Sequence, residues 1–587
     1  MVLFCSKMNE LKKILKRHFY ELSKNVFILS LIFASAILPL MVKTITELKN
    51  SINSGLPALA VSYYQRIYNF DDGFMLGNFY VETGNFIQRS VDFYNLGEII
   101  QRIGFKLFGN NLILSYYFFS LLYLSLWIYL IAKILIFSRS HSNIKVVIIV
   151  TVLLVVFFSN SSLISGLYRF SQIINPQFSI VIWLLGIFLL KKIFENENGS
   201  IYPYSILYFL NIIVASLSYI FVFISLLSTT FVAIVYFFIQ KHRLMGFKFT
   251  ILLFFSVTPY LIIMINNLNH KNFADLSERL GLVETRIPGA ALTFVIACLS
   301  LIFILLRSKI WPPRKIDQIE KVLIISSLGL ILASQSNVFT NKALQFSDHF
   351  QIFIFCNLVV LLSYLVSSNK FIKHIHLPPI PIFVIASFLI ILSLSKTLLP
   401  VIHSNKPTYL HTVLNGKFES NDNIIVDTFF SDTFPIYSKG KMLYQNDIYT
   451  YKFSNRELLE RYYISKGCPS NFSKESMSPI LVYRIEANMQ KAQSIEKYLK
   501  YMNLENDLNN FFIPLKEKAV DSDLRITDEL SDFLDYYSNK SCISLAKSFD
   551  IDVILFDDKS NWNLILNNFK SLYVSHGRFN SINLSKI

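Results

Sequence analysis

The sequence predicts a polytopic α-helical membrane protein with a C-terminal extracytoplasmic α/β domain. Of the 587 residues, 53% are hydrophobic and only 16% are charged, and the mean hydropathy is +0.46. Before residue 400 the apolar residues form long runs, most of them near the roughly 20 residues that a helix needs to cross a bilayer. After residue 400 the composition becomes that of a soluble domain. These observations divide the chain into segments 1–25, 26–400 and 401–587.

The apolar runs predict about 11 transmembrane helices within residues 26–400. The 202–240 block is long enough for two spans, and we divide it near Ser216–Ser218. The expected spans are 26–42, 111–137, 145–159, 177–194, 202–217, 219–240, 248–266, 288–306, 321–338, 350–367 and 378–400.

The distribution of charge predicts the orientation of these spans. Residues 401–587 hold 22 Lys and Arg against 23 Asp and Glu, so the first 400 residues carry the whole of the net charge of +16. This excess alternates between loops as the positive-inside rule requires, which places the N-terminus in the cytoplasm and the C-terminal domain outside. A nucleic-acid partner is not expected, because the soluble domain is near neutral. The expected inner loops contain Arg139 and Lys145, Lys191 and Lys192, Lys241, Arg243 and Lys248, Arg307, Lys309, Arg314 and Lys315, and Lys370 and Lys373.

The N-terminal segment 1–25 is basic and contains apolar residues at helical spacing. This pattern indicates either an amphipathic helix on the inner membrane surface or a solvated helical extension. The segment has no clear cleavage site before a polar sequence, so we do not expect a cleaved signal peptide.

The outer loop 43–110 contains the first candidate site, the pair Asp71 and Asp72 before Gly73. One carboxylate would act as a general base, and the other, with Asp72 the candidate, would orient it or hold a divalent cation. The alternative without a catalytic role is a solvated loop with helix-capping aspartates. Against it stand the flanking Arg66 and Arg89 and the many aromatic residues nearby. The stretches 79–86 and 91–107 are predicted to be helices lying along the membrane interface.

Two further outer segments contain candidate phosphate ligands. Arg169 precedes the span that begins after Asn175-Pro176, and Arg forms forked hydrogen bonds to phosphate. The alternative is an Arg that anchors a helix end at the interface. His349 follows Asp348 at the start of another span, where Asp348 is expected to cap the helix. A helix N-terminus disfavours a protonated imidazole, which argues against a cationic His349.

The C-terminal segment 401–587 predicts a small α/β domain. Short β-branched runs at 424–426, 480–485 and 553–556 are expected to be strands. Ser454 and Glu457 match a capping box for a helix through Tyr463, and Cys542–Phe549 is expected to be a second helix. A hairpin is predicted around His576-Gly577. Cys468 and Cys542 are candidates for a disulfide, because both lie in an outer domain where disulfides persist, and the sequence, which gives no distance between them, leaves open whether they pair. The triplets Asp521-Ser-Asp523 and Asp550-Ile-Asp552 are assigned no metal-binding role.

This arrangement resembles the GT-C superfamily of polytopic membrane glycosyltransferases, in its bacterial, polyprenyl-phosphate-sugar dependent type. The resemblance is carried by one span before a long acidic-pair loop, then many spans and an outer α/β tail. Its motifs are Asn69-Phe-Asp-Asp-Gly-Phe74, Arg169 with Asn175-Pro176-Gln177, Ser347-Asp348-His349, Val426-Asp-Thr, Phe453–Arg461 and Asp552–Asp558.

The resemblance implies an enzyme of the bacterial inner (plasma) membrane that transfers a sugar, with inversion, from a polyprenyl-phosphate-linked donor. The acceptor would be a cell-envelope glycan or lipid on the outer face. Asp71 or Asp72 would be the base, and Arg169 and His349, together with Arg66 and Arg89, would hold the donor phosphate. Two alternatives remain: a non-enzymatic flippase or transporter of lipid-linked glycans, and a membrane protein that only binds glycan. A flippase would require charges lining the spans, and the spans contain few.

Overall fold

A computed structural model describes two parts of the chain. In the helical part it describes residues 26–46, 96–109, 112–136, 143–159, 177–195, 202–269, 297–302, 304, 306, 316–336 and 349–368. In the C-terminal part it describes residues 418, 422–427, 434, 440–444, 453–470, 472, 532–533, 535–537, 540–576 and 579–587.

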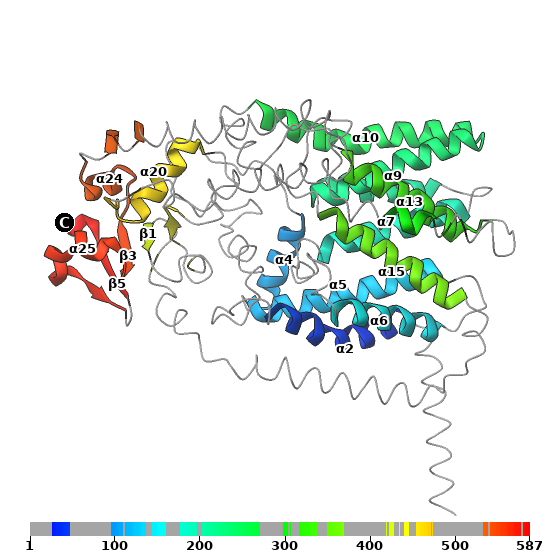
Figure 1. Cartoon of the computed structure of the whole chain (residues 1–587), viewed down its shortest axis with the longest axis horizontal. Helices are drawn as coiled ribbons and strands as arrows, with labels where there is room; N and C mark the ends of the chain where they lie inside the picture. The colour runs from blue at the N-terminus through cyan, green and yellow to red at the C-terminus, as the bar shows by residue number, and fades with distance from the viewer. Residues whose placement is uncertain are drawn as a thin grey trace, which may run out of the picture.

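The helical part is a bundle whose long helices coincide with the predicted apolar segments (Figure 1). Residues 297–302 are also helical and fall in the predicted span 288–306, whereas the predicted span 378–400 lies outside the described residues. The turn 217–219 divides the 202–240 block where the sequence analysis placed the break. The helices are α2 (Val26–Thr46), α4 (Leu96–Leu107), α5 (Leu112–Leu135), α6 (Asn143–Ser159), α7 (Ser179–Glu195), α8 (Tyr202–Ser216), α9 (Ile220–Ile239), α10 (Arg243–Leu268), α13 (Gln318–Ser334) and α15 (Phe350–Ser368).

Three of the described helices are long and apolar enough to cross a membrane. Their apolar stretches are Leu114–Leu135 in α5, Ile220–Ile239 in α9 and Arg243–Ile265 in α10. Shorter apolar helices accompany them at 26–35, 203–216 and 350–366. The described residues therefore show a mostly helical protein with a few candidate membrane-spanning helices, and they do not establish the expected count of 11. In α10 only 11% of the apolar stretch is buried, against 67% in α5, which places α10 at the periphery.

Small and polar residues hold the bundle helices together. At Gly329 of α13 an added Cβ would lie 2.5 Å from the Cα of Thr229 in α9, so only glycine permits this close approach. Asn211 of α8 donates to the Ile182 carbonyl of α7 at 2.9 Å, and Asn357 of α15 donates to Ser326 Oγ of α13 at 2.7 Å. Close backbone approach and hydrogen bonds between helices are the usual cohesive forces where lipid, not water, surrounds a bundle.

The C-terminal part contains a five-stranded mixed sheet with strand order β2-β1-β3-β5-β4. Strand β1 pairs in parallel with β2 on one side and with β3 on the other. Strand β5 pairs antiparallel with both β3 and β4. The strands are β1 (Asn423–Asp427), β2 (Lys441–Met442), β3 (Val553–Asp557), β4 (Val574–Ser575) and β5 (Phe579–Asn583).

Both faces of the central strands are buried, as is usual where strands pair in parallel. Ile425, Ile554 and Phe556 pack on one face against Leu459 of α20 (Asn455–Ser465), Leu545 of α24 (Cys542–Ser548) and Trp562 of α25 (Asn561–Ile565). Ile424, Val426 and Leu555 alternate with them and are also buried. The predicted strands at 424–426 and 553–556, the two predicted helices and the closing hairpin are therefore confirmed. The predicted strand 480–485 lies outside the described residues.

The predicted capping box at Ser454 is only half formed. Ser454 Oγ accepts from the Glu457 backbone N–H at 3.1 Å and caps α20. The Glu457 carboxylate does not return to Ser454; instead it pairs with the buried Arg461 guanidinium at 3.0 Å. Arg461 also donates to the Leu443 carbonyl at 3.2 Å, next to β2, so Glu457 serves to neutralise a cation that fixes α20 against the sheet edge.

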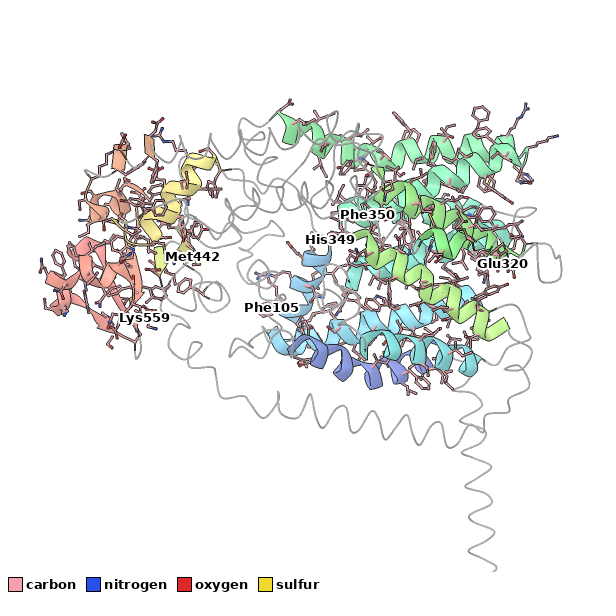
Figure 2. The ribbon with its side chains drawn as sticks, in the orientation of Figure 1. Phe105, Glu320, His349, Phe350, Met442 and Lys559 are labelled. Carbon is pink, nitrogen blue, oxygen red and sulfur yellow. A yellow bond between two sulfur atoms is a disulfide. The ribbon has the colours of Figure 1, made fainter. Side chains whose placement is uncertain are left out.

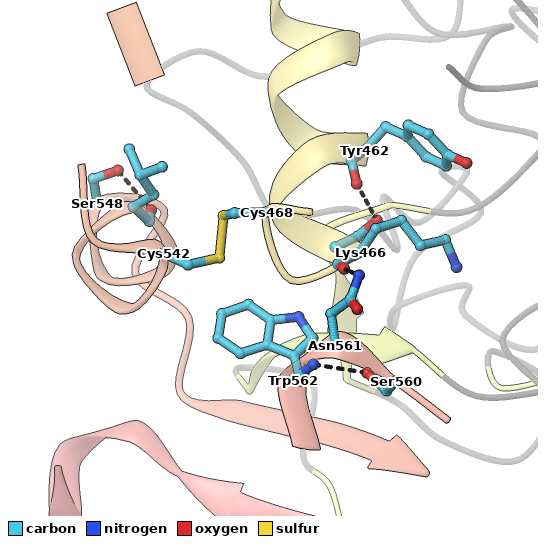
Figure 3. The surroundings of a disulfide bond; sticks show 10 residues. Tyr462, Lys466, Cys468, Cys542, Ser548, Ser560, Asn561 and Trp562 are labelled. Carbon is cyan, nitrogen blue, oxygen red and sulfur yellow. Dashed lines mark hydrogen bonds between the residues drawn. A yellow bond between two sulfur atoms is a disulfide. The ribbon is translucent and has the colours of Figure 1, made fainter. Parts of the chain in front are cut away.

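The candidate disulfide between Cys468 and Cys542 is present, with the two Cα atoms 5.8 Å apart (Figure 3). It joins the turn after α20 to the start of α24. Gly467 in this turn has a φ of +69°, and its Cβ would lie 3.0 Å from the Trp562 backbone nitrogen. Asn561 donates to the Lys466 carbonyl at 3.1 Å, so the turn, α24 and α25 form one linked unit.

Candidate functional site

The candidate site that the structure describes lies at one end of the helix bundle. We call it the α4-end cluster and define it by Glu98 and Gln101 of α4, Tyr123 of α5, Gln177 before α7, Tyr219 before α9 and His349 before α15. Figure 2 shows His349 and Phe105 of α4 at this end of the bundle, with Glu320 at the other end.

His349 is held in place by aromatic neighbours from the turn that joins α8 and α9. The Tyr219 hydroxyl hydrogen-bonds with His349 Nδ1. The Phe221 ring lies 4.7 Å from the imidazole, and the Tyr219 ring stacks on it at 5.9 Å. His349 immediately precedes Phe350 of α15, so its predicted place at a helix start is confirmed. Because Tyr219 occupies Nδ1, contact between His349 and a phosphate would have to be made through Nε2.

Helix α4 buries two polar side chains together with Phe105, and it exposes two apolar side chains together with Lys106. Glu98 and Gln101 are fully buried, whereas Ile103 and Leu107 are 44% and 78% exposed. A water-soluble protein normally has the opposite arrangement, because burial of apolar surface drives its folding. An outer face of apolar residues that also carries a lysine suits a helix that lies in the membrane interface. This agrees with the interfacial helix predicted for 91–107, of which the structure describes 96–107.

Helix α4 is anchored on both of its neighbours at this end. The Leu96 backbone N–H donates to the Leu217 carbonyl at 3.0 Å, which joins α4 to the turn that carries Tyr219. Phe108, just after α4, packs on Phe118 of α5 at 5.0 Å. Gly104 lies over the Phe119 ring, where an added Cβ would be 2.0 Å from a ring carbon. These contacts hold α4 against α5 and the α8–α9 turn.

The start of α7 completes the cluster. The Trp127 indole N–H of α5 donates to the Gln177 carbonyl at 3.0 Å. The Tyr123 ring packs on Phe178 at 5.6 Å. Gln177 comes directly after Asn175-Pro176 in the sequence, and these two residues and Arg169 lie outside the described residues. The predicted start of a helix at 177 is confirmed, although α7 becomes regular only at Ser179.

Most of the site residues predicted from the sequence lie outside the described residues. These are Asp71, Asp72, Arg66, Arg89 and Arg169, and also Asp348. His349 is the member of the predicted set that the structure places. The sequence analysis missed Gln101, Tyr123 and Tyr219. For Gln101 a signal was available, because Glu98 and Gln101 recur three residues apart and therefore share one face of the predicted interfacial helix.

The opposite end of the bundle holds a second polar cluster, which we call the Lys191 network. It consists of Lys133, Lys191, Glu195, Asp317, Glu320 and Tyr364. The buried Lys191 ammonium donates to the Lys133 carbonyl at 3.3 Å and pairs with Glu195 at 3.2 Å. Asp317 and Glu320 form a reciprocal capping box at the start of α13, and Tyr364 of α15 donates to both carboxylates.

Lys191 corrects one detail of the predicted topology. The sequence analysis placed it in an inner loop, but it is a fully buried residue of α7, just before the last turn of that helix. Its aliphatic stem packs inside the bundle, and its ammonium reaches one of the last carbonyls of α5, which have no partner within that helix. The cation therefore caps a neighbouring helix instead of standing in solvent.

A third polar cluster lies at the carboxyl end of β1 in the C-terminal sheet. Asp427 pairs with Lys466 at 2.8 Å and accepts from Ser560 Oγ at 2.5 Å. These groups satisfy one another and join β1 to α20 and α25. Asp552 accepts from the Asn423 backbone N–H at 2.9 Å, and Asn423 donates to the Asp550 carbonyl. The triplet Asp550-Ile-Asp552 therefore holds strands together. Among the described residues no group of three or more His, Cys, Asp or Glu is placed to hold a metal ion.

Comparison with known proteins does not assign the chain to a class. Neither the protein-family models nor the curated proteins include a match to it. What the described residues define is a mostly helical protein with apolar helices of membrane-spanning length and a small mixed sheet closed by a disulfide.

Proposed function

We propose that the protein is a polytopic membrane glycosyltransferase of about 11 spans that works on the outer face of the plasma membrane. It transfers a sugar from a polyprenyl-phosphate donor to a cell-envelope glycan or lipid. Asp71 or Asp72 removes the acceptor proton, and Arg169 and His349, with Arg66 and Arg89, hold the donor phosphate.

One observation carries the proposal: three segments that are distant in sequence meet at one end of the bundle. Helix α4 follows the loop of Asp71 and Asp72, Gln177 follows the segment of Arg169, and His349 is tied to the α8–α9 turn. This supports the proposal because a base and a phosphate ligand can cooperate only if they lie close together, and the described residues that follow their segments do. The disulfide of the C-terminal domain supports an extracytoplasmic location for that domain, because disulfides persist in oxidising compartments.

The test is sugar transfer by purified Asp71→Asn and Asp72→Asn variants. Asn has nearly the same shape as Asp but cannot accept the proton, so membrane insertion should be preserved. One variant should lower turnover by about 10²–10⁴-fold, the usual contribution of a positioned general base. The other should cost less, or should change a dependence on divalent cations.

The matched control is Asp427→Asn, since Asp427 lies in the C-terminal sheet with its own partners Lys466 and Ser560. It should leave transfer close to the wild-type rate. If the double variant Asp71→Asn/Asp72→Asn inserts normally and transfers sugar at the wild-type rate, the catalytic role of the loop is refuted, and a flippase or glycan-binding protein becomes the better description.

A further inference from the structure

The Gln101 side chain is buried in the bundle beside the Tyr123 hydroxyl, close enough to interact with it. Neither the amide nitrogen nor the amide oxygen of Gln101 makes a hydrogen bond of normal geometry, and neither does the Tyr123 hydroxyl. Gln101 is fully buried and Tyr123 is only 3% exposed. Buried polar groups in native proteins are almost always paired. Two adjacent exceptions therefore point to a ligand that supplies the missing donors and acceptors.

The surroundings of this pair are aromatic, apart from the buried Glu98 carboxylate one turn earlier on α4. Tyr116, Phe119, Ser120 and Tyr123 lie on one face of α5 at helical spacing. Phe178 adds a ring on the α7 side. Amides and hydroxyls both donate and accept, which matches sugar hydroxyl groups, whereas a phosphate is held best by cationic donors. Aromatic walls with a few convergent polar groups are typical of sites for small organic ligands.

The exposed apolar face of α4 indicates how such a ligand would arrive. Ile103 and Leu107 point away from the bundle, while Glu98 and Gln101 point into it. If the apolar face lies among lipid chains, the polar face stands at the level of the lipid headgroups. A sugar carried on a lipid would therefore reach Gln101 without leaving the membrane interface.

We propose that Gln101 and Tyr123 form a binding site for the uncharged, hydroxyl-bearing headgroup of a glycosylated lipid. The site binds the sugar, and other residues bind the phosphate. This inference rests on the proposed function, because the lipid-linked sugar would be the donor of the transfer reaction. It adds specificity-determining residues that are separate from the aspartate pair and from the phosphate ligands.

The test measures binding without turnover. Full-length protein in phosphatidylethanolamine and phosphatidylglycerol nanodiscs is titrated with a polyprenyl-phosphate hexose and with the same polyprenyl phosphate lacking the sugar. Gln101→Leu and Tyr123→Phe should each weaken binding of the hexose lipid by about tenfold, the loss expected for one buried hydrogen bond. Binding of the sugar-free lipid should not change.

A second measurement separates a ligand site from a structural role. In ligand-free protein, Gln101→Leu should maintain or raise the melting temperature, because it removes a buried polar group that makes no hydrogen bond of normal geometry. The matched control is Asn211→Leu, which removes a buried amide that is paired with the Ile182 carbonyl. It should lower the melting temperature without changing the preference for the hexose lipid.

Three results would overturn the inference. One is equal affinity of the wild-type protein for the two lipids, whether measurable or undetectable. Another is an equal loss for both lipids in Gln101→Leu. The third is a lower melting temperature of ligand-free Gln101→Leu with unchanged affinities, which would assign Gln101 to an internal water molecule. Unchanged transfer in the Asp71 and Asp72 variants would refute the proposed catalytic role of that loop. It would not affect the inference about Gln101 and Tyr123, which the lipid titration tests separately.

Discussion

The two ends of the helix bundle treat buried polar groups in opposite ways. At the Lys191 network the charged groups find partners: Lys191 meets a carbonyl and a carboxylate, and Asp317 and Glu320 close a capping box. At the α4-end cluster, which also contains the buried Glu98, the Gln101 amide and the Tyr123 hydroxyl make no hydrogen bond of normal geometry. The cost of burying a charge without a partner is several times that of burying an amide. The first end is therefore built for stability, while the second can remain ready for a ligand.

The comparison of the two bundle ends depends on which side of the membrane each end faces. The redox state of Cys468 and Cys542 reports the side on which the C-terminal domain lies. In the proposed topology the C-terminal domain lies on the same side as the α4-end cluster. The double variant Cys468→Ser/Cys542→Ser opens a crosslink between residues 74 apart in the sequence. It should destabilise the C-terminal domain by about 2–4 kcal/mol, the usual contribution of such a crosslink. The measurement is calorimetry of the full chain with and without reductant.

The control for the disulfide is Cys298→Ser, because Cys298 is a free thiol in the helical part. It should leave the reductant-sensitive transition unchanged. Mass spectrometry of unreduced protein taken directly from cells should find Cys468 and Cys542 without free thiols. Two free thiols there would place the C-terminal domain in a reducing compartment and would exchange the assigned sides of the two ends.

The second prediction concerns the stabilising end. Lys191→Met retains most of the apolar stem but leaves the buried Lys133 carbonyl without its side-chain donor, and the unfolding free energy should fall by about 1–3 kcal/mol. Lys192→Met is the matched control, since Lys192 pairs with the same Glu195 at 2.6 Å but is half-buried and solvated. It should cost within about 0.5 kcal/mol. Denaturation in mixed micelles gives both values.

The two ends should therefore respond to loss of a polar group with opposite signs. Lys191→Met should destabilise, whereas Gln101→Leu should not. If both variants destabilise the ligand-free protein equally, the distinction between a structural end and a ligand-binding end of the bundle is wrong.

The sequence was sufficient for features determined by local pattern. Apolar runs of helical length became helices, and the β-branched runs at Ile424 and Val553 became adjacent parallel strands. The two-residue strand β2 has no pattern of its own and forms only because β1 offers an edge. The burial of Lys191 was not predicted either. The sequence shows the charge of Lys191 but not that an α5 carbonyl lies beside it.

The candidate site shows the same limit. The acidic pair and Arg169 were found because unusual charges stand out in a polar loop. Neither Gln101 nor Tyr123 is unusual within its own helix. They became candidates only because the packing of α4 against α5 brings their side chains together. His349 was recognised from its position at a helix start, but its contacts with Tyr219 and Phe221 depend on the packing of α15 against α9.

The smallest expected effect concerns a carboxylate of intermediate character, Glu460 of α20. It is partly buried and accepts from the Tyr537 hydroxyl. Burial raises the pKa of Glu460 and nearby Glu457 adds to the increase, while Arg456, Arg461 and Lys540 oppose it. Like the groups of the Lys191 network, Glu460 has a hydrogen-bond partner. Like the α4-end cluster, it is a polar group whose surroundings do not fully offset the cost of its burial.

The sign of its pH dependence follows from this shift. A folded-state pKa above the unfolded value of 4.5 means that the folded protein binds the proton more tightly. The resulting stability is fully present below the unfolded pKa and is lost as the pH rises through the folded pKa. Glu460→Gln keeps an acceptor for Tyr537 and removes the charge. The reductant-sensitive transition should then rise slightly at neutral pH, by less than the disulfide variant lowers it, and should vary less with pH just above 4.5. Asp558→Asn, in an exposed turn, is the control and should keep the wild-type profile. A steeper profile in Glu460→Gln would mean that the carboxylate is better compensated when charged, which would place it with the paired groups of the Lys191 network.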